Sequence, residues 1–416
     1  MKQDSFQIPQ PTKIKVASIT PFWRAKEFIA IMSNFFNQNE TKLKKEISKE
    51  LKNIHNIPFE YCYFFDSGRS AIYFSLISLG LKKGDKVIIP SFTCRALLFA
   101  LFKVGVEPIV GDIDQDYNLD LKSLVFECDL KGVKAIIIPN MFGKMNGNYE
   151  LIKKLKIKGL IVIEDNATSF GSSYDNEILS DALIYSFNIG KMINGSGGGL
   201  VFMRHKASLG EFYEFKSQKR SKVVFRFLRE LVSLRFRKQT SVIISFFRRR
   251  INMQKSLDDY YSFKDKISNE TQKYFKCKKI SLLNLILICS QVKDYDRIRL
   301  SYDKLFNNYN SKLGLKSRFK KNETPNYFLI EINKNIDRYE LGSYLSSHGI
   351  ETNWSYFPIH KIKIYRDIAR INKLATTNQK WSNFLYLPFN LFTSEEDVDF
   401  VCEQYRKYLE NYEESK

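Results

Sequence analysis

The feature that most constrains this fold is a series of short apolar segments that alternate with helical patterns along the first half of the chain. The segments are rich in Ile and Val and lack the apolar–polar alternation of a half-exposed strand, which indicates burial on both faces. Buried strands separated by helices predict an α/β fold with a mainly parallel central sheet covered by helices on both faces. The expected strands are 61–65, 86–90, 107–112, 134–139 and 160–164, followed by a strand that ends at Ser186 and a strand at 200–203.

The composition is that of a folded protein without a disulfide framework. Of the 416 residues, 44% are hydrophobic, which is enough for a sizeable core. The six cysteines have no paired spacing and the four histidines form no cluster, so we expect neither disulfides nor a metal site. The N-terminus lacks the apolar core of a signal peptide, and no apolar run reaches the ~18 to 20 residues of a membrane span. These features predict a cytoplasmic protein.

The positive charge is concentrated in one segment. The formal net charge is +21, and the stretch from Lys216 to Lys255 holds thirteen Lys or Arg residues and one acid, Glu230. A chain that is basic throughout favours nucleic acid as its partner, whereas one basic stretch indicates an inserted element with a partner of its own. We therefore expect no nucleic acid binding. The chain divides into an N-terminal arm and helix (1–55), a large domain (56–207), a basic-aromatic insertion (208–265) and a C-terminal region (266–416).

Polar residues stand where the predicted strands end. In the turn 66–70, free backbone N–H groups, the dipole of the following helix and Arg69 can hold an anion, although an ordinary helix cap explains the same turn. Asp165 and Ser186 follow two other strands, and Lys191 lies on the next loop. These side chains can meet because the carboxyl ends of parallel strands share one edge. A lysine near an apolar core can act as a nucleophile toward a carbonyl, but Lys191 taken alone is more simply a surface cation.

Five short motifs follow one another along the chain: SGRSA, PSFT, VIEDNA, SFNIGK and GGG. Together they resemble the pattern of the DegT/StrS family of pyridoxal phosphate (PLP)-dependent sugar aminotransferases, which have the fold-type-I aminotransferase architecture. The resemblance covers residues 60–205 and resumes from 280 to the end with NWSYFPIH and LYLPFNLFTSEEDVDFV. It implies that 56–207 is a PLP-binding domain and that a smaller α/β domain lies near the C-terminus.

The resemblance implies a role for each residue of this edge. Lys191 would carry PLP as a Schiff base and move a proton between the substrate carbon and the cofactor. Asp165 would pair with the pyridine nitrogen, so that the ring can accept electrons. The phosphate would be held by residues from two strand ends: Ser67, Gly68, Arg69 and Ser186. Lysine at 191, in place of the histidine of some relatives that dehydrate sugars, favours amino transfer.

Four places depart from the family pattern. Cys94 stands where relatives stack an aromatic ring on the cofactor, and Thr168 stands where Gln or His lies beside its phenolic oxygen. The run 196–199 lacks the usual acid, and 277–281 replaces an Asn-x-Arg-Met-Ser motif that reaches the cofactor of a partner subunit. Two interpretations stay open: an unusual substrate, or a non-catalytic protein that keeps the scaffold for binding or regulation.

Two further residues match family positions near the substrate. Asn140 follows the strand 134–139, where relatives carry histidine, and His360 ends the sequence Tyr-Phe-Pro-Ile-His. A lone histidine is more often structural, so both interpretations of His360 stay open. The resemblance predicts transfer of an amino group from an amino acid, typically glutamate, to a nucleotide-linked keto sugar. Such products serve the assembly of surface polysaccharide or glycoconjugates.

Two segments bear on assembly and location. The apolar stretch 282–292 is a candidate dimer helix, since fold-type-I relatives build each active site from two subunits, but an internal core helix explains it equally well. The stretch 223–251 interleaves aromatic and aliphatic residues with arginines, and as a helix it presents an apolar stripe bordered by guanidinium groups. This stripe can pack on the protein's own body, lie against an anionic membrane at its inner face, or bind an anionic sugar nucleotide or polymer.

Overall fold

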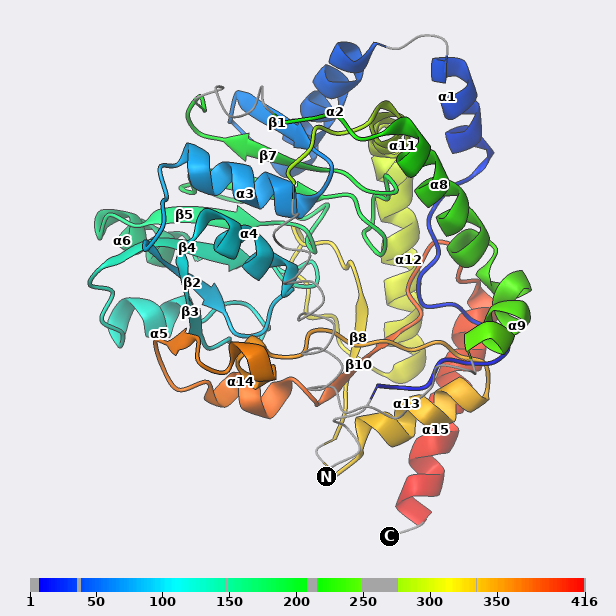
Figure 1. Ribbon diagram of the computed structural model, residues 1–416. Coiled ribbons are helices and arrows are strands. Elements are labelled where there is room, and N and C mark those ends of the chain that lie inside the picture. Colours follow the sequence, from blue (N-terminus) through cyan, green and yellow to red (C-terminus); the bar gives the residue numbers. More distant parts are fainter. Residues whose placement is uncertain are drawn as a thin grey trace.

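A computed structural model of the chain describes residues 7–35, 39–146, 148–207, 215–248, 276–333 and 335–414. The large sheet is built from β1 (Tyr61–Phe65), β2 (Lys86–Pro90), β3 (Glu107–Gly111), β4 (Val133–Pro139), β5 (Ile161–Asp165), β6 (Ala182–Ser186), β7 (Gly199–Met203) and β9 (Ala369–Arg370). Within the described residues its eight strands lie in the order β1-β7-β6-β5-β4-β2-β3-β9 (Figure 1). The pairs from β6 to β9 are parallel, and β7 is antiparallel to both of its neighbours. The predicted α/β fold with a mainly parallel sheet is confirmed.

Helices cover both faces of this sheet. They are α3 (Gly68–Ser78), α4 (Ala96–Val104), α5 (Leu121–Phe126) and α6 (Tyr149–Ile157). Alternate residues of β2 show why the strands are unbroken apolar runs. Val87 and Ile89 join the large core that includes α3 and α4, whereas Ile88 joins a second core with α5 and α6. Because both faces are buried, neither needs polar residues.

The C-terminal part forms a smaller α/β unit beside the large sheet (Figure 1). Its elements are α12 (Tyr295–Leu313), β8 (Phe328–Glu331), α13 (Arg338–Ser347), 3-10 turns at Ile359–Lys361 and Lys363–Tyr365, α14 (Ala375–Lys380), β10 (Phe384–Leu387) and α15 (Glu395–Glu414). The strands β8 and β10 pair antiparallel, while β9 pairs with β3 at the edge of the large sheet. The chain therefore has the smaller C-terminal unit that the sequence predicts, and the exact domain boundaries stay predictions.

The N-terminal helices α1 (Ala25–Phe35) and α2 (Glu40–His55) both pack on α11 (Leu282–Val292). Residues 284–292 of α11 are all buried within this chain. In α2 the buried residues repeat every four positions and form one stripe: Leu43, Ile47, Leu51 and His55. Because α11 is covered in this way, its role at a dimer interface stays a prediction.

The described part of the basic segment is helical, with α8 (Arg220–Glu230), a π-helical turn (Leu231–Arg235) and α9 (Arg237–Arg248). The inner face of α8 packs on the body, since the ring of Phe227 lies 4.8 Å from that of Trp23 and shares a small core with Leu287. On the outer face Phe225 is 68% exposed. Packing on the protein's own body therefore accounts for the inner face. For the outer face, contact with an anionic membrane and binding of an anionic sugar nucleotide or polymer stay open. The side chains of 243–251 lie outside the described residues.

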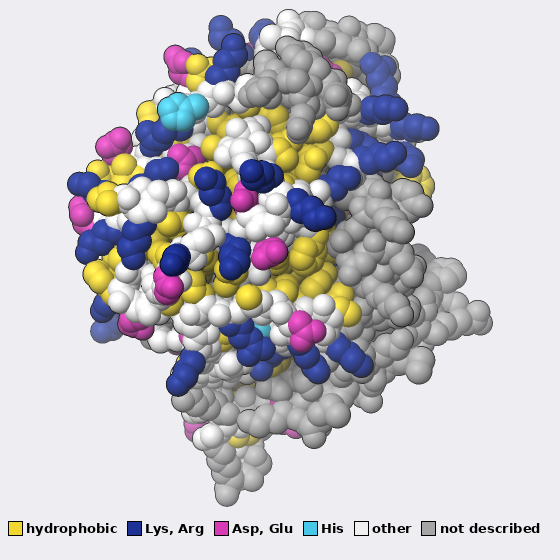
Figure 2. Space-filling model, turned by 60° about the vertical axis from the view of Figure 1, so that its left-hand side comes forward, with side chains coloured by type: hydrophobic (Ala, Val, Ile, Leu, Met, Phe, Trp, Pro, Cys, Tyr) yellow, Lys and Arg dark blue, Asp and Glu magenta, His cyan; other side chains and the backbone are white. Residues whose placement is uncertain are grey.

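Among the described residues, no helix combines the length and the apolar character that crossing a membrane requires. In the same part of the chain, no group of three or more His, Cys, Asp and Glu side chains is placed to hold a metal ion. Figure 2 shows Lys and Arg interspersed with Asp and Glu over the described side chains of the face it presents.

His55, at the end of α2, is fully buried and packs against the rings of Phe170 and Tyr185. Its Nδ1 lies 2.7 Å from the carbonyl oxygen of Ser172, to which the Nδ1–H donates. Burial lowers the pKa of His55 to about 4, although the hydrogen bond to Ser172 opposes this shift. Between pH 4 and about 6.5 the unfolded chain therefore binds a proton that the folded chain rejects.

We expect the contribution of neutral His55 to the free energy of unfolding to be complete above about pH 6.5. As the pH drops toward 4, this contribution should fall by about 3 kcal/mol. Urea unfolding across this pH range measures the change. His55→Leu should flatten this part of the profile, whereas the same change at the exposed His205 should leave it steep. Identical pH profiles for His55→Leu and the parent chain would contradict the assignment.

Gly199 opens β7 and pairs with Phe65 of β1 and Ser186 of β6. A Cβ at this position would lie 2.4 Å from the backbone N of Gly68, so Gly199→Ala must displace the turn before α3. We expect a loss of about 1 to 3 kcal/mol in unfolding free energy, measured by urea titration. The control is Gly111→Ala in β3, where the Cβ would meet only side-chain methyls, the nearest at 3.2 Å. Equal losses at the two strand glycines would overturn the prediction.

Candidate active site

Three strands of the large sheet end at one edge. Because β7 is antiparallel to both β1 and β6, and β5 is parallel to β6, the strands β1, β5 and β6 run in the same direction. Asp165 and Ser186 are the last residues of β5 and β6, and the turn with Ser67 follows β1. Lys191 lies on the loop after β6. The structure therefore brings these four predicted site residues to one rim.

The turn before α3 is a helix cap with an open N-terminus. Ser67 is the N-cap residue, and its Oγ accepts a backbone N–H of the first turn at 3.3 Å. Gly68 approaches Ser186 so closely that a Cβ would lie 3.2 Å from the Ser186 Oγ. The guanidinium of Arg69 lies 5.2 Å from the ring centre of Phe99, and burial lowers its pKa. A hydroxyl, a guanidinium and a helix N-terminus thus lie together, an arrangement that suits an anion.

The rim also holds a carboxylate near an amine. Oδ1 of Asp165 accepts the N–H of Ala167 at 3.0 Å. Burial raises the pKa of Asp165, whereas the bond from Ala167 and the positive charge of Lys191 lower it. Lys191 is half-buried, and its backbone N–H donates to the carbonyl of Asn188 at 3.2 Å. The Lys191 side chain is therefore near enough to stabilise the ionised form of Asp165.

At the ends of β4 and β5 a buried network fixes Asn140. Its Nδ2 donates to Oε2 of Glu164 at 3.0 Å and to Oδ1 of Asn166 at 2.6 Å, and its Oδ1 accepts the N–H of Asn146 at 2.6 Å. Thr168 Oγ1 donates to the carbonyl of Asn140 at 2.8 Å. Both polar side chains are thus bonded inside the protein, and the predicted contacts of Asn140 with substrate and of Thr168 with cofactor stay predictions.

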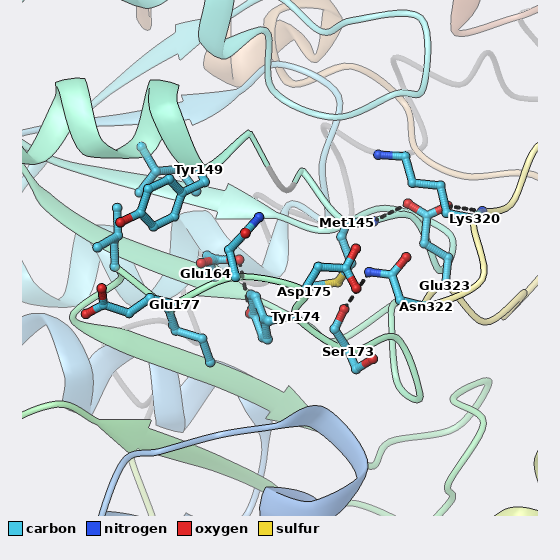
Figure 3. A pocket seen from close by; sticks show the side chains of 14 residues that line it. Met145, Tyr149, Glu164, Ser173, Tyr174, Asp175, Glu177, Lys320, Asn322 and Glu323 are labelled. Carbon is cyan, nitrogen blue, oxygen red and sulfur yellow. Dashed lines mark hydrogen bonds between the residues drawn. The ribbon is translucent and has the colours of Figure 1, made fainter.

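A small polar cavity lies beside Glu164 (Figure 3). The hydroxyl of Tyr174 donates to the Glu164 carboxylate at 3.0 Å, and Ser180 donates a second bond. On the other side of the cavity, Glu323 accepts backbone N–H groups of Met145 and Lys320. The volume is about 60 Å³, well below the ~300 to 1,000 Å³ of ordinary ligand pockets. We therefore interpret this network as structural.

Two predicted site residues lie on or against the loop after β2. His360 is buried, with Nδ1 bonded to the hydroxyl of Ser91 and Nε2 lying 3.1 Å from Oδ1 of Asn378. Burial lowers the pKa of His360 to about 4. The bond to Ser91 attaches the C-terminal unit to the loop after β2, and the bond to Asn378 of α14 fixes the ring within that unit. Both bonds support the structural interpretation, and a substrate contact stays a prediction. Cys94 is exposed just before α4, on the loop that follows β2.

A cavity of about 310 Å³ adjoins the turn before α3, and four of its seven lining residues are cations. The full lining is Asp66, Ser67, Arg69, Asn188, Arg226, Lys276 and Lys278. The sequence identified Ser67 and Arg69 but missed Arg226, because arginines in a basic segment resemble surface residues. The available signal was helical spacing, which places Arg226 on the same face of α8 as the apolar Val223 and Phe227.

A larger cavity of about 580 Å³ lies between the loops after β3 and β4 and the C-terminal unit. Its walls include the rings of Tyr117, Phe142 and Tyr327. The hydroxyl of Tyr327 donates to the carbonyl of Gly190 at 3.3 Å, which connects this wall to the loop of Lys191. The volume falls in the ~300 to 1,000 Å³ range of small-molecule sites.

Comparison with known proteins identifies the family. The sequence profile of the DegT/DnrJ/EryC1/StrS aminotransferase family matches residues 25–237 and 279–406. GDP-perosamine synthase of Escherichia coli O157:H7 is 23% identical over 355 residues, 84% of this chain and 86% of that protein. UDP-2-acetamido-2-deoxy-3-oxo-D-glucuronate aminotransferase of Pseudomonas aeruginosa is 34% identical over 149 residues, 34% of this chain and 41% of that protein.

The fold agrees with this result. The structure of E. coli GDP-4-keto-6-deoxy-D-mannose-3-dehydratase with bound hydrated PLP has a TM-score of 0.67 at 18% identity, covering 94% of this chain and 99% of that one. The rim fits such a cofactor, because the space left by Gly68 beside Ser186 and the cationic cavity suit a phosphate, and Asp165 suits a ring nitrogen. The chain belongs to the DegT/DnrJ/EryC1/StrS aminotransferase family and is a transaminase, with pyridoxal phosphate as its cofactor.

Proposed function

We propose that this protein transfers an amino group from glutamate to a keto sugar carried by a nucleotide. The observation that carries the proposal is the meeting of Lys191, Asp165 and the cationic turn before α3 at one rim of the sheet. The names of the two relatives, which refer to GDP- and UDP-linked sugars, support a nucleotide carrier. We assign the product to the assembly of surface polysaccharide or glycoconjugates.

Each rim residue has a distinct task in this proposal. When bound, PLP supplies a ring that accepts electrons from the substrate carbon. The Asp165 carboxylate, oriented by the N–H of Ala167, holds a proton at the pyridine nitrogen. The Lys191 amine binds the cofactor and moves the proton of the substrate α-carbon. Ser67, Gly68, Arg69 and Ser186 hold the phosphate at the N-terminus of α3.

The 580 Å³ cavity is our candidate for the sugar nucleotide. It adjoins the loop of Lys191 through Tyr327, and its aromatic walls suit the faces of a sugar or a base. Two of the three cations on its wall already have carboxylate partners, Lys144 with Asp116 and Arg318 with Glu331, and the third, Lys316, is exposed. We therefore expect apolar and stacking contacts, rather than new ion pairs, to dominate binding there. Tyr327→Ala should weaken inhibition by the free nucleotide, and unchanged inhibition would exclude this cavity.

A non-catalytic protein is the second candidate. It is favoured by Cys94, which offers an exposed thiol where the resemblance leads us to expect a stacked aromatic ring. A sulfur makes less contact with a cofactor ring than an aromatic side chain does. Such a protein would bind PLP without turnover. The Lys191 experiment below separates the two candidates, since only an enzyme responds to an amino donor.

For assembly we propose a cytoplasmic homodimer. Exposed apolar side chains gather on α1 and α8, two helices that contact each other through Phe28 and Phe227. Ile29 and Met32 are each 67% exposed on α1, and Phe225 is exposed on α8. A second copy is the occupant we favour, and a fully active monomer in light scattering would reject it. Contact with an anionic membrane is the alternative, which requires co-sedimentation with acidic but not neutral vesicles.

The substitution Lys191→Ala removes the amine and should abolish the visible absorption band that PLP produces when an amine of the protein binds it covalently. In the parent protein this band should form on PLP addition and bleach with glutamate. The control is Lys103→Ala, at an exposed position in α4, which should keep the band. Absence of a band in the parent protein would reject the enzyme, and a band that glutamate does not bleach would favour the non-catalytic candidate.

Asp165→Asn tests the carboxylate at the ring nitrogen. The variant should still bind PLP, because the phosphate contacts remain, but its turnover should fall by several orders of magnitude, because the amide cannot hold the ring proton. Single-turnover bleaching by glutamate measures this step. Asp175→Asn, an exposed carboxylate away from the rim, is the control and should keep its rate. Near-normal turnover in Asp165→Asn would refute the role.

A further inference from the structure

The inner face of α8 carries charged residues where an amphipathic helix normally carries apolar ones. Val223, Phe227 and Glu230 are buried, and Arg226 lies on the same face. The Nε and Nη2 atoms of Arg226 are buried and have no hydrogen-bond partner among the described residues. Buried polar groups are normally bonded, so this guanidinium lacks the acceptor that such a group usually has, although Arg226 lines an open cavity.

Arg226 is held against the glycine run, residues 195–199, which leads from the loop of Lys191 into β7. A Cβ on Gly197 would lie 2.2 Å from Nη2 of Arg226 and 2.7 Å from its Cζ, so glycine at 197 leaves the room that the guanidinium occupies. The next residue, Gly198, forms a parallel bridge with Ser67, and its N–H donates to the carbonyl of Asp66 at 2.8 Å. Arg226 is thereby fixed beside the turn that starts α3.

Arg226 and this turn share the cavity of about 310 Å³. Its remaining charged side chains are Asp66, Arg69, Lys276 and Lys278. The carboxylate of Asp66 accepts the hydroxyl of Ser70 at 2.5 Å, so the single acid of the lining is already bonded. The cavity therefore has an excess of positive charge at the positive end of a helix dipole.

Glu230 lies close to Arg226 and stabilises its positive charge. It lies one helical turn after Arg226 and is 1% exposed. Burial lowers the pKa of Arg226, and attraction to the carboxylates of Glu230 and Asp66 opposes that shift. Glu230 also lies near the hydroxyl of Ser196 in the glycine run. It is a positioning residue that stabilises the cation without using its hydrogen-bonding capacity, since no hydrogen bond within the described chain joins the Glu230 carboxylate to Arg226.

We propose that Arg226 is a phosphate-binding residue, and that it binds the phosphate of PLP at the N-terminus of α3. A guanidinium can form two parallel, charge-assisted hydrogen bonds with a phosphate, which its position beside Ser67 permits. The inference rests on the proposed function in placing the cofactor phosphate at this turn. The diphosphate of a sugar nucleotide is the other source of the same chemistry, and the experiment distinguishes the two.

The first experiment compares PLP with pyridoxal, which lacks the phosphate. Each compound is titrated into the apo protein, and binding is followed by the visible absorption band. The proteins compared are the parent chain, Arg226→Met, Arg226→Lys and the control Arg229→Met, which changes an exposed position on the same helix. We expect Arg226→Met to raise the Kd of PLP about 10- to 100-fold and to leave that of pyridoxal unchanged. Arg226→Lys should restore part of the affinity, and Arg229→Met should bind as the parent does.

The second experiment needs no covalent cofactor. Inorganic phosphate should raise the unfolding temperature of the apo parent chain and of Arg229→Met, and this shift should be lost in Arg226→Met. Because each variant is compared with its own phosphate-free sample, a general loss of stability does not imitate the result. A parent chain that forms no band but still shows the phosphate shift would reject the proposed function and keep the anion site.

Two results would overturn the inference. Equal PLP affinity in the parent chain and Arg226→Met, with reduced binding of UDP and GDP in the variant, would assign the arginine to the substrate diphosphate instead of the cofactor. Unchanged binding of PLP, UDP, GDP and inorganic phosphate would show that Arg226 binds no phosphate. A loss that is equal for PLP and pyridoxal would also reject the role, because the phosphate would not be what the arginine recognises.

Discussion

The site depends on one close backbone contact, where β7 passes the turn before α3. Gly199 lies between the ends of β1 and β6, and a Cβ there would collide with the backbone of the turn at Gly68. Gly68 in turn approaches the side chain of Ser186. This contact sets the distance between the helix N-terminus, Ser186 and the loop of Lys191. A side chain at either glycine would separate the groups that form the rim.

The fold was predictable from sequence wherever burial was complete. Val87, Ile88 and Ile89 face alternate cores, so the strand has no polar face, and an unbroken apolar run between helices is typical of a strand buried in this way. The edge strand β9 was not predictable, because it has two residues and is exposed. β9 pairs with β3 because the packing of the C-terminal unit places it at that edge of the sheet. A local sequence pattern does not encode such a tertiary contact.

The site was predictable where residues follow strands and less so where they come from other elements. Asp165 and Ser186 end strands, so the topology alone brings them together. Arg226 reaches the same place from α8, which joins the rim through tertiary packing and has no motif of its own. For Asn140 and His360 the sequence identified the residue type but not the bonding, and the structure shows both engaged inside the protein.

The basic segment shows why net charge is an incomplete guide to function. Beyond Arg226, Arg235 donates to the carbonyl of Trp23 at 3.0 Å, and Arg237 pairs with Glu351. These cations stabilise the attachment of the segment to the body and are not available to an external anion. A membrane or a second copy would instead meet the outer face of α8, where apolar residues such as Phe225 are exposed. Contact with that face would combine burial of its apolar residues with the charge of exposed cations such as Lys222 and Arg229.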